Sequence, residues 1–454
     1  MGGKPGEGLS PVDVLKFSGA YGMWLKSRFP GERLKVVLGR DARISGPVVS
    51  KITSSTLQAM GIDIIDGGLT TTPTVAMAVE HYNAHGGIII TASHNPKNWN
   101  ALKLLNEHGE FMTGAQGEEM QKFINWQDFD FVTVEKFGNY TNEECMVEMH
   151  IEKILALPLV DVDAIKAANF SIVIDAVNSV GGLAMPMLLE ALGVSQVHEI
   201  FCEPTGIFAH DPEPLPENLV ELSAAVVKQN AHLGIAVDPD VDRLALICED
   251  GEMFGEEYTL VAVADYLLSH TPGNTVSNLS SSQALAEVTI AHGQQYFSSA
   301  VGEVNVVETM KKHHAVIGGE GNGGVIYPAL HYGRDALVGV ALFLSQLAKF
   351  GKTCSVLKKK YPEYYISKNK IELPQEINLD QIFEKIIEKY TKQPIDTRDG
   401  VKIMFDKEWV HLRRSNTEPI IRIYSESDSL VKADHLGNKM ISDISEMLKE
   451  EQED

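Results

Sequence analysis

Short apolar runs rich in β-branched residues alternate with longer amphipathic stretches from residue 34 onward. Runs of strand length separated by segments of helical period are typical of strand-helix-strand units. In the first group, strands are predicted at residues 34–38, 62–65, 87–91 and 101–105, and helices at 47–60 and 73–84. This pattern predicts a mostly parallel sheet covered by helices.

The same order of elements returns twice further along the chain. The second group has predicted strands at 171–175 and 196–201, a helix ending at 189, a helix at 217–229, and two last strands on either side of DPDVDR. The third has predicted strands at 275–279, 295–299 and 315–318, a helix ending at 291, and a helix at 303–313. Three recurrences of one order predict three similar α/β/α domains.

The pattern changes after residue 366. A strand at 370–373 and a helix at 380–390 are predicted before an antiparallel set of strands at 401–405, 409–412 and 420–425, and a last helix is predicted at 430–448. Strands that follow one another without crossover helices predict an α+β domain. We therefore place four domains, at 1–148, 149–252, 253–366 and 367–454, around one central cleft.

In the first group, the polar loop TASHNP directly follows an apolar strand, at the sheet edge where open α/β folds bind ligands. Ser93 is a candidate covalent nucleophile, and an ordinary polar turn is the alternative. The loop lacks the GxSxG elbow, and no Ser-His-Asp triad follows from the spacing, so acyl transfer has little support.

The second group carries the loop DPDVDR, which places Asp238, Asp240 and Asp242 at alternate positions. Three close carboxylates suit a hard cation such as Mg²⁺. This ion prefers about six oxygen ligands, so three carboxylates leave a position for a phosphoryl oxygen. An EF-hand loop would need a glycine after the third acidic position, where Arg243 stands instead. A solvated acidic turn is the remaining alternative.

Two further loops carry polar groups suited to a phosphorylated sugar. GEGNGG matches neither the P-loop nor the Rossmann fingerprint, but Glu320 and Asn322 offer an acceptor and a donor for neighbouring hydroxyls; a flexible turn is the alternative. RRSNTEP is a candidate phosphate nest, with Arg422 on the next strand; a surface ion-pair turn is its alternative.

Composition narrows the partners. The formal net charge of −23 disfavours nucleic acid and anionic membrane surfaces, while leaving open a small anion held by local basic groups. The four cysteines form no CxxC pair, which disfavours a disulfide framework or a structural zinc site, and no apolar run has the length of a membrane span. We expect a cytoplasmic protein, monomeric or homodimeric.

Taken together, the loops supply a serine, a metal site, a hydroxyl reader and a phosphate clamp, which favours phosphoryl transfer to a polyol. The set TASHNP, DPDVDR, GEGNGG and RRSNTEP, in this order, resembles the α-D-phosphohexomutases over nearly the whole chain. That family comprises phosphoglucomutase, phosphomannomutase and phosphoglucosamine mutase. The resemblance implies three similar α/β domains and a mobile fourth domain that closes the cleft.

The resemblance also implies roles for individual residues. Ser93 matches the serine that carries the transferable phosphate, and one phosphoserine oxygen would complete the Mg²⁺ site of the three aspartates. Lys103 matches a lysine proposed to assist proton transfer, and His94 and Arg243 match conserved loop positions. The residues matching those that contact substrate are Glu320, Asn322, Arg413, Ser415, Asn416 and Thr417, with Arg422 beside them.

The implied reaction interconverts hexose 1-phosphates and hexose 6-phosphates through phosphoserine and a hexose 1,6-bisphosphate, with Mg²⁺ as cofactor. Mannose or glucose phosphates are the leading expectation and phosphoglucosamine is the alternative. A serine-phosphate hydrolase would share the nucleophile and metal but would give the last two loops no evident task. A non-catalytic sugar-phosphate-binding protein is a further alternative.

Two departures from the family pattern stand out. Members usually begin with a strand and a loop of the type Ser-Gly-Ile-Arg-Gly, whereas this sequence starts beyond that loop, and its segment GLSPVDVLKFSGAYG reads as the helix that follows. We expect the DNA directly upstream to encode that strand, with a trimmed or impaired chain as alternatives. In the sugar loop, Gly324 occupies the position of a histidine found in many bacterial members.

Overall fold

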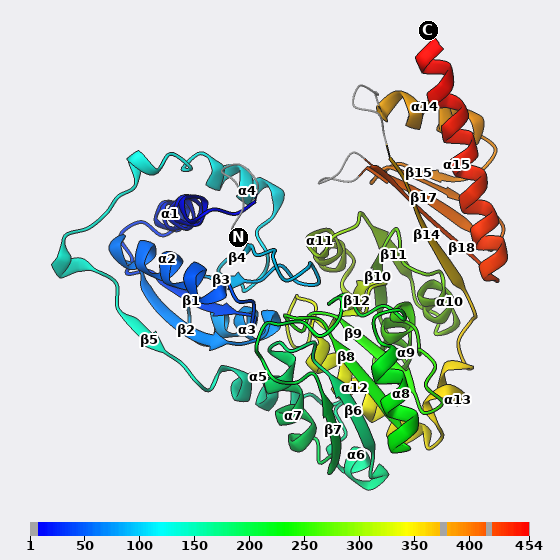
Figure 1. Ribbon diagram of the computed structural model, residues 1–454, viewed down its shortest axis with the longest axis horizontal. Coiled ribbons are helices and arrows are strands. Elements are labelled where there is room, and N and C mark those ends of the chain that lie inside the picture. Colours follow the sequence, from blue (N-terminus) through cyan, green and yellow to red (C-terminus); the bar gives the residue numbers. More distant parts are fainter. Residues whose placement is uncertain (1–7, 373–378, 415–419, 454) are drawn as a thin grey trace. The chain divides into compact units, whose positions relative to one another are not determined.

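The computed structural model describes residues 8–372, 379–414 and 420–453, with backbone only at residue 126 and from residue 449 onward. The chain forms two compact units, and Figure 1 labels their helices and strands. One comprises Met1–Thr271 and Asn322–Lys358, and the other comprises Pro272–Gly321 and Lys359–Asp454. Each unit therefore combines two separate stretches of the sequence. No helix in the described part is long and apolar enough to span a membrane.

The first unit begins with a sheet built around β1 (Lys35–Arg40). β1 pairs in parallel with β2 (Asp63–Leu69) and β3 (Gly86–Ile90), β4 (Leu102–Leu105) adds antiparallel to β3, and β5 (Tyr140–Asn142) adds parallel to β2. The order β4-β3-β1-β2-β5 confirms the predicted mostly parallel sheet. The apolar run at 101–105 is antiparallel, because it returns from the polar loop that follows β3.

Alternation along these strands assigns helices to both faces of the sheet. Val36 and Leu38 of β1 pack with α1 (Pro11–Arg28) and α2 (Gly46–Ala59), whereas Val37 packs with α3 (Thr72–His81). Successive side chains of a strand point to opposite faces, so one short strand contributes to two cores. The helix read at the start of the sequence is α1, whose capping box is formed by Ser10 and Asp13.

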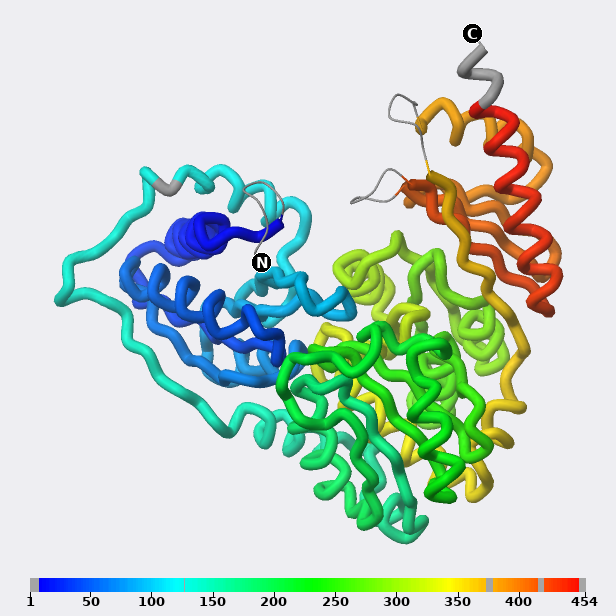
Figure 2. Tube along the Cα trace, viewed as in Figure 1, coloured from blue at the N-terminus to red at the C-terminus, as the bar shows by residue number. Residues whose placement is uncertain are grey.

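A long excursion connects β4 to β5 within this sheet before the chain enters the second sheet. After α4 (Gly114–Gln121), the chain passes through the short 3₁₀ turns η1 (Trp126–Asp128) and η2 (Val134–Lys136) and reaches β5, as Figure 2 shows in cyan. The helices α5 (Met146–Leu155) and α6 (Val162–Ala168) then lead to the second sheet. The periodicity had predicted none of these short elements.

The second sheet has the order β7-β6-β8-β9, with bounds β6 (Ser171–Asp175), β7 (Gln196–Ile200), β8 (Leu233–Val237) and β9 (Leu244–Cys248). Every residue of β6, β8 and β9 is buried, as expected for strands covered on both faces. Its helices are α7 (Gly181–Ala191) and α8 (Val220–Gln229). The predicted start of α8 at 217 is three residues early, and DPDVDR connects β8 to the antiparallel β9.

The first unit is completed by elements from before and after Pro272–Gly321, the stretch that belongs to the second unit. α9 (Glu256–Leu268) packs against α12 (Ala336–Phe350), which also contacts α5 and α6. The strand β13 (Gly324–Ile326) precedes α12, and α13 (Cys354–Lys358) follows it. Twelve consecutive residues of α12, from 336 to 347, are buried, which identifies it as a central helix of this unit.

The second unit contains a parallel and an antiparallel sheet. β10 (Asn274–Asn278) pairs in parallel with β11 (Tyr296–Ser299) and β12 (Ala315–Glu320), accompanied by α10 (Ala284–Ala291) and α11 (Glu303–His313). The antiparallel sheet has the order β14-β18-β17-β16-β15 and confirms the α+β prediction. Its elements are β14 (Tyr365–Glu372), α14 (Leu379–Lys389), β15 (Ile395–Asp396), β16 (Val401–Met404), β17 (Trp409–Arg414), β18 (Ile420–Ser427) and α15 (Leu430–Glu453).

Candidate active site

The serine of TASHNP lies in a tight turn at the end of β3. Ser93 has a left-handed backbone with φ +48°, which is uncommon for a residue with a side chain. Its N–H donates to Oγ1 of Thr91 at 2.9 Å, and this bond holds the turn. The Ser93 hydroxyl donates to Oδ2 of Asp238 at 2.7 Å. The turn, called the serine turn below, therefore points the Ser93 hydroxyl towards Asp238 in the loop DPDVDR, called the acidic loop below.

The three aspartates of DPDVDR converge in the turn between β8 and β9. Asp238, Asp240 and Asp242 are all 0% exposed, and one carboxylate oxygen from each lies within 4.8 Å of the others. Oδ1 of Asp238 accepts the N–H groups of Asp242 and Arg243, both at 3.1 Å, so the loop folds around its first carboxylate. The structure confirms that alternate positions in the sequence form one buried cluster.

Two cations offset this buried negative charge. Lys103 on β4 donates to Oδ2 of Asp240 at 2.6 Å and to Oδ2 of Asp242 at 3.1 Å, and Arg334 donates to the same Asp242 oxygen at 2.7 Å. Burial alone would raise the pKa of Asp242, but Arg334 and Lys103 lower it below its usual range. Burial and the neighbouring carboxylates raise the pKa of Asp238 well above its usual range.

The carboxylates retain capacity for a cation. Oδ1 of Asp240 and Oδ1 of Asp242 are buried and have no hydrogen-bond partner among the described residues. Buried carboxylate oxygens without partners are costly, and hard divalent cations prefer such oxygens as ligands. The residues present therefore fit a divalent metal ion, with Ser93 directly beside the ligands.

His94 and Arg243 lie next to the serine. His94 Nε2 lies 3.4 Å from the Arg243 guanidinium, and its Nδ1 lies 3.4 Å from the Ser93 hydroxyl. Burial and the Arg243 charge lower the pKa of His94 to about 4, so its imidazole is neutral at pH 7. A second nitrogen of Arg243 donates to Glu213 at 3.2 Å.

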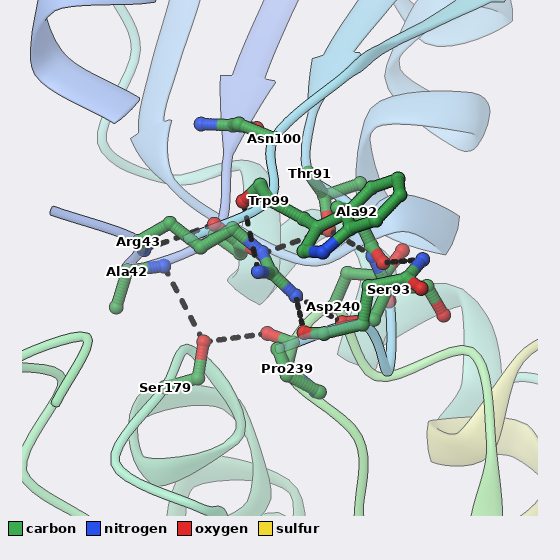
Figure 3. A network of polar contacts seen from close by, with 12 residues as sticks. Ala42, Arg43, Thr91, Ala92, Ser93, Trp99, Asn100, Ser179, Pro239 and Asp240 are labelled. Atoms are coloured by element: carbon green, nitrogen blue, oxygen red, sulfur yellow. Dashed lines mark hydrogen bonds and ion pairs between the residues drawn. The ribbon is translucent and has the colours of Figure 1, made fainter. Parts of the chain in front are cut away.

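A buried arginine that the sequence reasoning did not single out organises the serine turn (Figure 3). Arg43 is 0% exposed and pairs with Asp41 at 2.9 Å. Its guanidinium donates to four carbonyl oxygens of the turn, those of Ser93, Asn95, Pro96 and Trp99, at 2.5 to 2.9 Å. Arg43 lies in the segment GRDARISG, between the strand predicted at 34–38 and the helix predicted at 47–60, and its distant carbonyl partners give no signal in that segment.

The same segment is tied to the acidic loop. The Ser179 hydroxyl donates to the Pro239 carbonyl at 2.7 Å and accepts the Ala42 N–H at 3.3 Å, as Figure 3 shows. On the other side, the N–H of Thr72 donates to the Asp240 carbonyl at 2.9 Å, and its hydroxyl donates to Oδ2 of Asp240 at 2.5 Å. Buried backbone and side-chain bonds therefore fix the serine turn and the acidic loop within one rigid frame.

The remaining predicted residues are divided between the units. Asn322 belongs to the first unit, where its Oδ1 accepts the Gly324 N–H at 3.3 Å. In the second unit, Glu320 ends β12 and accepts hydrogen bonds from Asn278 and from the Gly302 N–H. Arg413 lies on β17, not in a loop, and donates to Asp399 at 2.8 Å.

The register places Arg422 of β18 opposite Arg413. Both arginines are thus brought together at one position of the antiparallel sheet. The predicted phosphate-binding residues Ser415, Asn416 and Thr417 lie outside the described residues.

Comparisons with known proteins cover almost the whole chain. The profiles of the phosphoglucomutase/phosphomannomutase α/β/α domains I, II and III match residues 2–130, 148–251 and 255–365, and that of the C-terminal domain matches residues 370–441. A phosphoglucomutase/phosphomannomutase of Thermococcus kodakarensis is 36% identical over 96% of both chains. A phosphoglucosamine/phosphogalactosamine mutase of Sulfurisphaera tokodaii is 30% identical over 97% of this chain and 96% of its own.

A solved structure agrees with these relatives. The crystal structure of a phosphoglucomutase/phosphomannomutase family protein from Burkholderia thailandensis superposes with a TM-score of 0.84 at 25% identity, covering 97% of this chain and 95% of the other. Four domain profiles, near-complete coverage and the buried Ser-Asp site agree with one another. The chain belongs to the phosphoglucomutase/phosphomannomutase family of hexose-phosphate mutases, and is an enzyme of the isomerase class.

Proposed function

We propose that this enzyme interconverts hexose 1-phosphates and hexose 6-phosphates, with Ser93 as the carrier of the transferred phosphoryl group. The observation that carries the proposal is the Ser93 hydroxyl, held at 2.7 Å from Asp238 in a buried triad of aspartates. Phosphoryl transfer depends mostly on positioning and on neutralising charge. A serine fixed beside a divalent cation site meets both requirements.

Asp238, Asp240 and Asp242 would hold Mg²⁺ through the carboxylate oxygens described above, together with one oxygen of phosphorylated Ser93. Bound there, the metal would supply charge neutralisation at the phosphoryl oxygens. The chain's own groups do the rest of the positioning: Arg43 fixes the turn, and Arg243 and Lys103 place positive charge around the serine.

We propose that the phosphoryl transfer takes place in two steps. The Oγ–P bond of phosphoserine breaks as a P–O bond forms to the free hydroxyl of the hexose monophosphate, and the proton lost by that hydroxyl passes to Oγ of Ser93, giving a hexose 1,6-bisphosphate and a free Ser93 hydroxyl. The other phosphate then returns to Oγ of Ser93, whose proton passes to the sugar oxygen that is released, which regenerates phosphoserine and frees the isomeric monophosphate. Burial alone would lower the pKa of Lys103, but Asp240 and Asp242 raise it above its usual range, so its ammonium is protonated at pH 7 and can donate a hydrogen bond to a sugar oxygen.

The names of the relatives divide between two groups of hexose phosphates. The Thermococcus relative bears the names of mannose and glucose phosphate mutases, and the Sulfurisphaera relative those of the amino-sugar mutases. We propose mannose and glucose phosphates as the preferred substrates, on the higher identity of the first, with glucosamine phosphate as the second candidate. A cytoplasmic location and a monomeric or homodimeric state stay predictions.

The test is an assay with Mg²⁺, a trace of hexose 1,6-bisphosphate and, separately, the 1-phosphates of mannose, glucose and glucosamine. Formation of 6-phosphate without free phosphate is the expected result. Ser93→Ala should abolish interconversion, and Ser195→Ala, at an exposed serine, should leave it intact. Release of inorganic phosphate would indicate a hydrolase, and full activity of Ser93→Ala would refute the serine assignment.

A further inference from the structure

Gly324 lies where any side chain would collide with Arg334. A Cβ built on Gly324 would lie 2.4 Å from Cδ and 3.0 Å from Cγ of Arg334. Such distances are far below ordinary van der Waals contact between carbon atoms, so a side chain at 324 requires Arg334 to move. Since Gly324 does not have a left-handed backbone, space is the reason for glycine at this position.

The backbone of Arg334 is fixed alongside the short strand that contains this glycine. An isolated antiparallel bridge joins Arg334 to Ile326, and the N–H of Asp335 donates to the Val325 carbonyl at 2.8 Å. Residues two apart on a strand share a face, so Gly324 and the bridge partner Ile326 present the same side to Arg334. The stem of Arg334 therefore passes over Gly324.

The residue after Arg334 anchors this arrangement from the other side. Oδ1 of Asp335 caps α12 by accepting the N–H groups of Leu337 and Val338, at 2.8 and 3.2 Å. Its Oδ2 lies 2.9 Å from Nε2 of His150 on α5. Asp335 is 0% exposed, so these bonds lie in the buried interior, where the low local dielectric strengthens them.

The guanidinium of Arg334 ends at the acidic loop. It donates to Oδ2 of Asp242 at 2.7 Å and is itself only 8% exposed, while Oδ1 of the same carboxylate has no hydrogen-bond partner among the described residues. A guanidinium bound to one oxygen orients the carboxylate plane and leaves the other oxygen for a cation. The acidic loop is also bonded to this segment by the Ala336 N–H, which donates to the Val241 carbonyl at 3.2 Å.

We propose that Arg334 is a positioning residue for phosphoryl transfer, which holds Asp242 in the orientation that binds the divalent metal, and that Gly324 is needed to admit it. The inference rests on the proposed mutase function for its kinetic readout only, because metal binding is measured without turnover. Glycine is required at position 324 because the stem of Arg334 occupies the space that a side chain there would fill.

The test is a double-mutant cycle on the full chain with Gly324→Ala, Arg334→Ala and their combination. Isothermal calorimetry of the metal-free protein with Mg²⁺ is the first readout. Arg334→Ala is expected to raise the Mg²⁺ dissociation constant about 10–100-fold, as is typical for partners of metal ligands. Gly324→Ala should act in the same direction, and the double variant should match Arg334→Ala within about twofold, because both changes remove one contact.

Two further variants separate the guanidinium from its stem. Arg334→Met keeps the stem and loses the charge, and is expected to weaken Mg²⁺ binding as much as Arg334→Ala. Arg334→Lys keeps a charge and is expected to restore part of the affinity. Controls are Gly117→Ala, whose added methyl meets open space, and Arg28→Ala at the surface.

The second readout is the steady-state rate, where kcat at saturating substrate should fall while KM changes less than about threefold, because Arg334 acts through Asp242. Wild-type Mg²⁺ affinity in Arg334→Met, tighter binding in Arg334→Ala, or effects of the two single changes that multiply in the double variant would each overturn the proposal. If the wild type binds Mg²⁺ but does not interconvert hexose phosphates, the mutase proposal fails and the calorimetric cycle still decides the role of Arg334.

Discussion

Replacing Arg43 by Met should show how much the serine turn depends on one buried guanidinium. Methionine retains most of the apolar stem, so the change removes chiefly the pair with Asp41 and the four donations to carbonyls of residues 93 to 99. Breaking a buried ion pair by removing one partner costs about 3–5 kcal/mol, because the other charge remains buried. We expect Arg43→Met to lower the free energy of unfolding by at least that amount.

The pH dependence of this loss has a defined sign. Burial raises the pKa of Asp41 to about 6, although Arg43 opposes the shift, so the pKa of Asp41 rises further when Arg43 is removed. When the pKa of a carboxyl group is higher in the folded state than its unfolded value of about 3.9, the free energy of unfolding increases as the pH falls. The stability deficit of Arg43→Met should therefore be smaller at pH 5 than at pH 7.

The assay is urea unfolding at both pH values, combined with hydrogen exchange of the backbone amides of residues 91 to 100. Arg33→Met, which removes a surface pair with Asp63, is the matched control and should unfold as the wild type does. Asp41→Asn added to Arg43→Met should recover part of the loss at pH 7, since it removes the orphaned charge. An Arg43→Met protein with control-like stability and unchanged exchange in the turn would refute the reasoning.

Three further results are expected. Burial lowers the pKa of His411 to about 4 in the folded protein, against about 6.5 when unfolded, so the free energy of unfolding should fall by up to about 3 kcal/mol as the pH drops from 6.5 to 4. Urea unfolding between pH 7 and pH 4 tests this, and the same pH dependence of unfolding in His411→Gln as in the wild type would contradict it. Asp335→Ala removes the α12 cap and should cost at least about 1 kcal/mol in thermal unfolding, whereas Asp335→Asn, which keeps an acceptor, should cost less; equal losses would argue against the cap. Chelation of divalent metal should abolish interconversion and Mg²⁺ should restore it with an unchanged circular dichroism spectrum; activity that survives chelation would exclude a metal role for Asp240.

Local hydrophobic patterns in the sequence were enough to predict the α/β architecture. Strand β6 has the apolar residues Ile172–Ile174 at its centre and β8 is the run LGIAV, and the helices between them keep a 3.6-residue period, so the α/β groups could be predicted. The ends of elements were harder to predict from the sequence, because a strand ends where its pairing with a neighbouring strand ends. β14 begins at Tyr365, five residues before the predicted strand, since it pairs with β18 over its full length.

The acidic loop and the serine turn could be identified because their chemistry is local. Asp238, Asp240 and Asp242 stand within five residues of each other, and Ser93 lies in a compact polar turn. Arg43 and Arg334 could not be found in this way, because their partners lie about 50 and 92 residues distant in sequence. Neither hydrophobic period nor motif spacing encodes a bond between a side chain and a carbonyl or carboxylate so remote.

The discontinuous make-up of the first unit constrains how the protein emerges from the ribosome. α9 is buried against α12, but α12 is translated some 70 residues later, after the whole of Pro272–Gly321 has been made for the other unit. Ten of the thirteen residues of α9 are buried in the finished fold, so this helix must wait with an uncovered apolar surface. Nascent chains halted before residue 336 should therefore engage chaperones that bind exposed apolar segments, and those extended past residue 358 should release them.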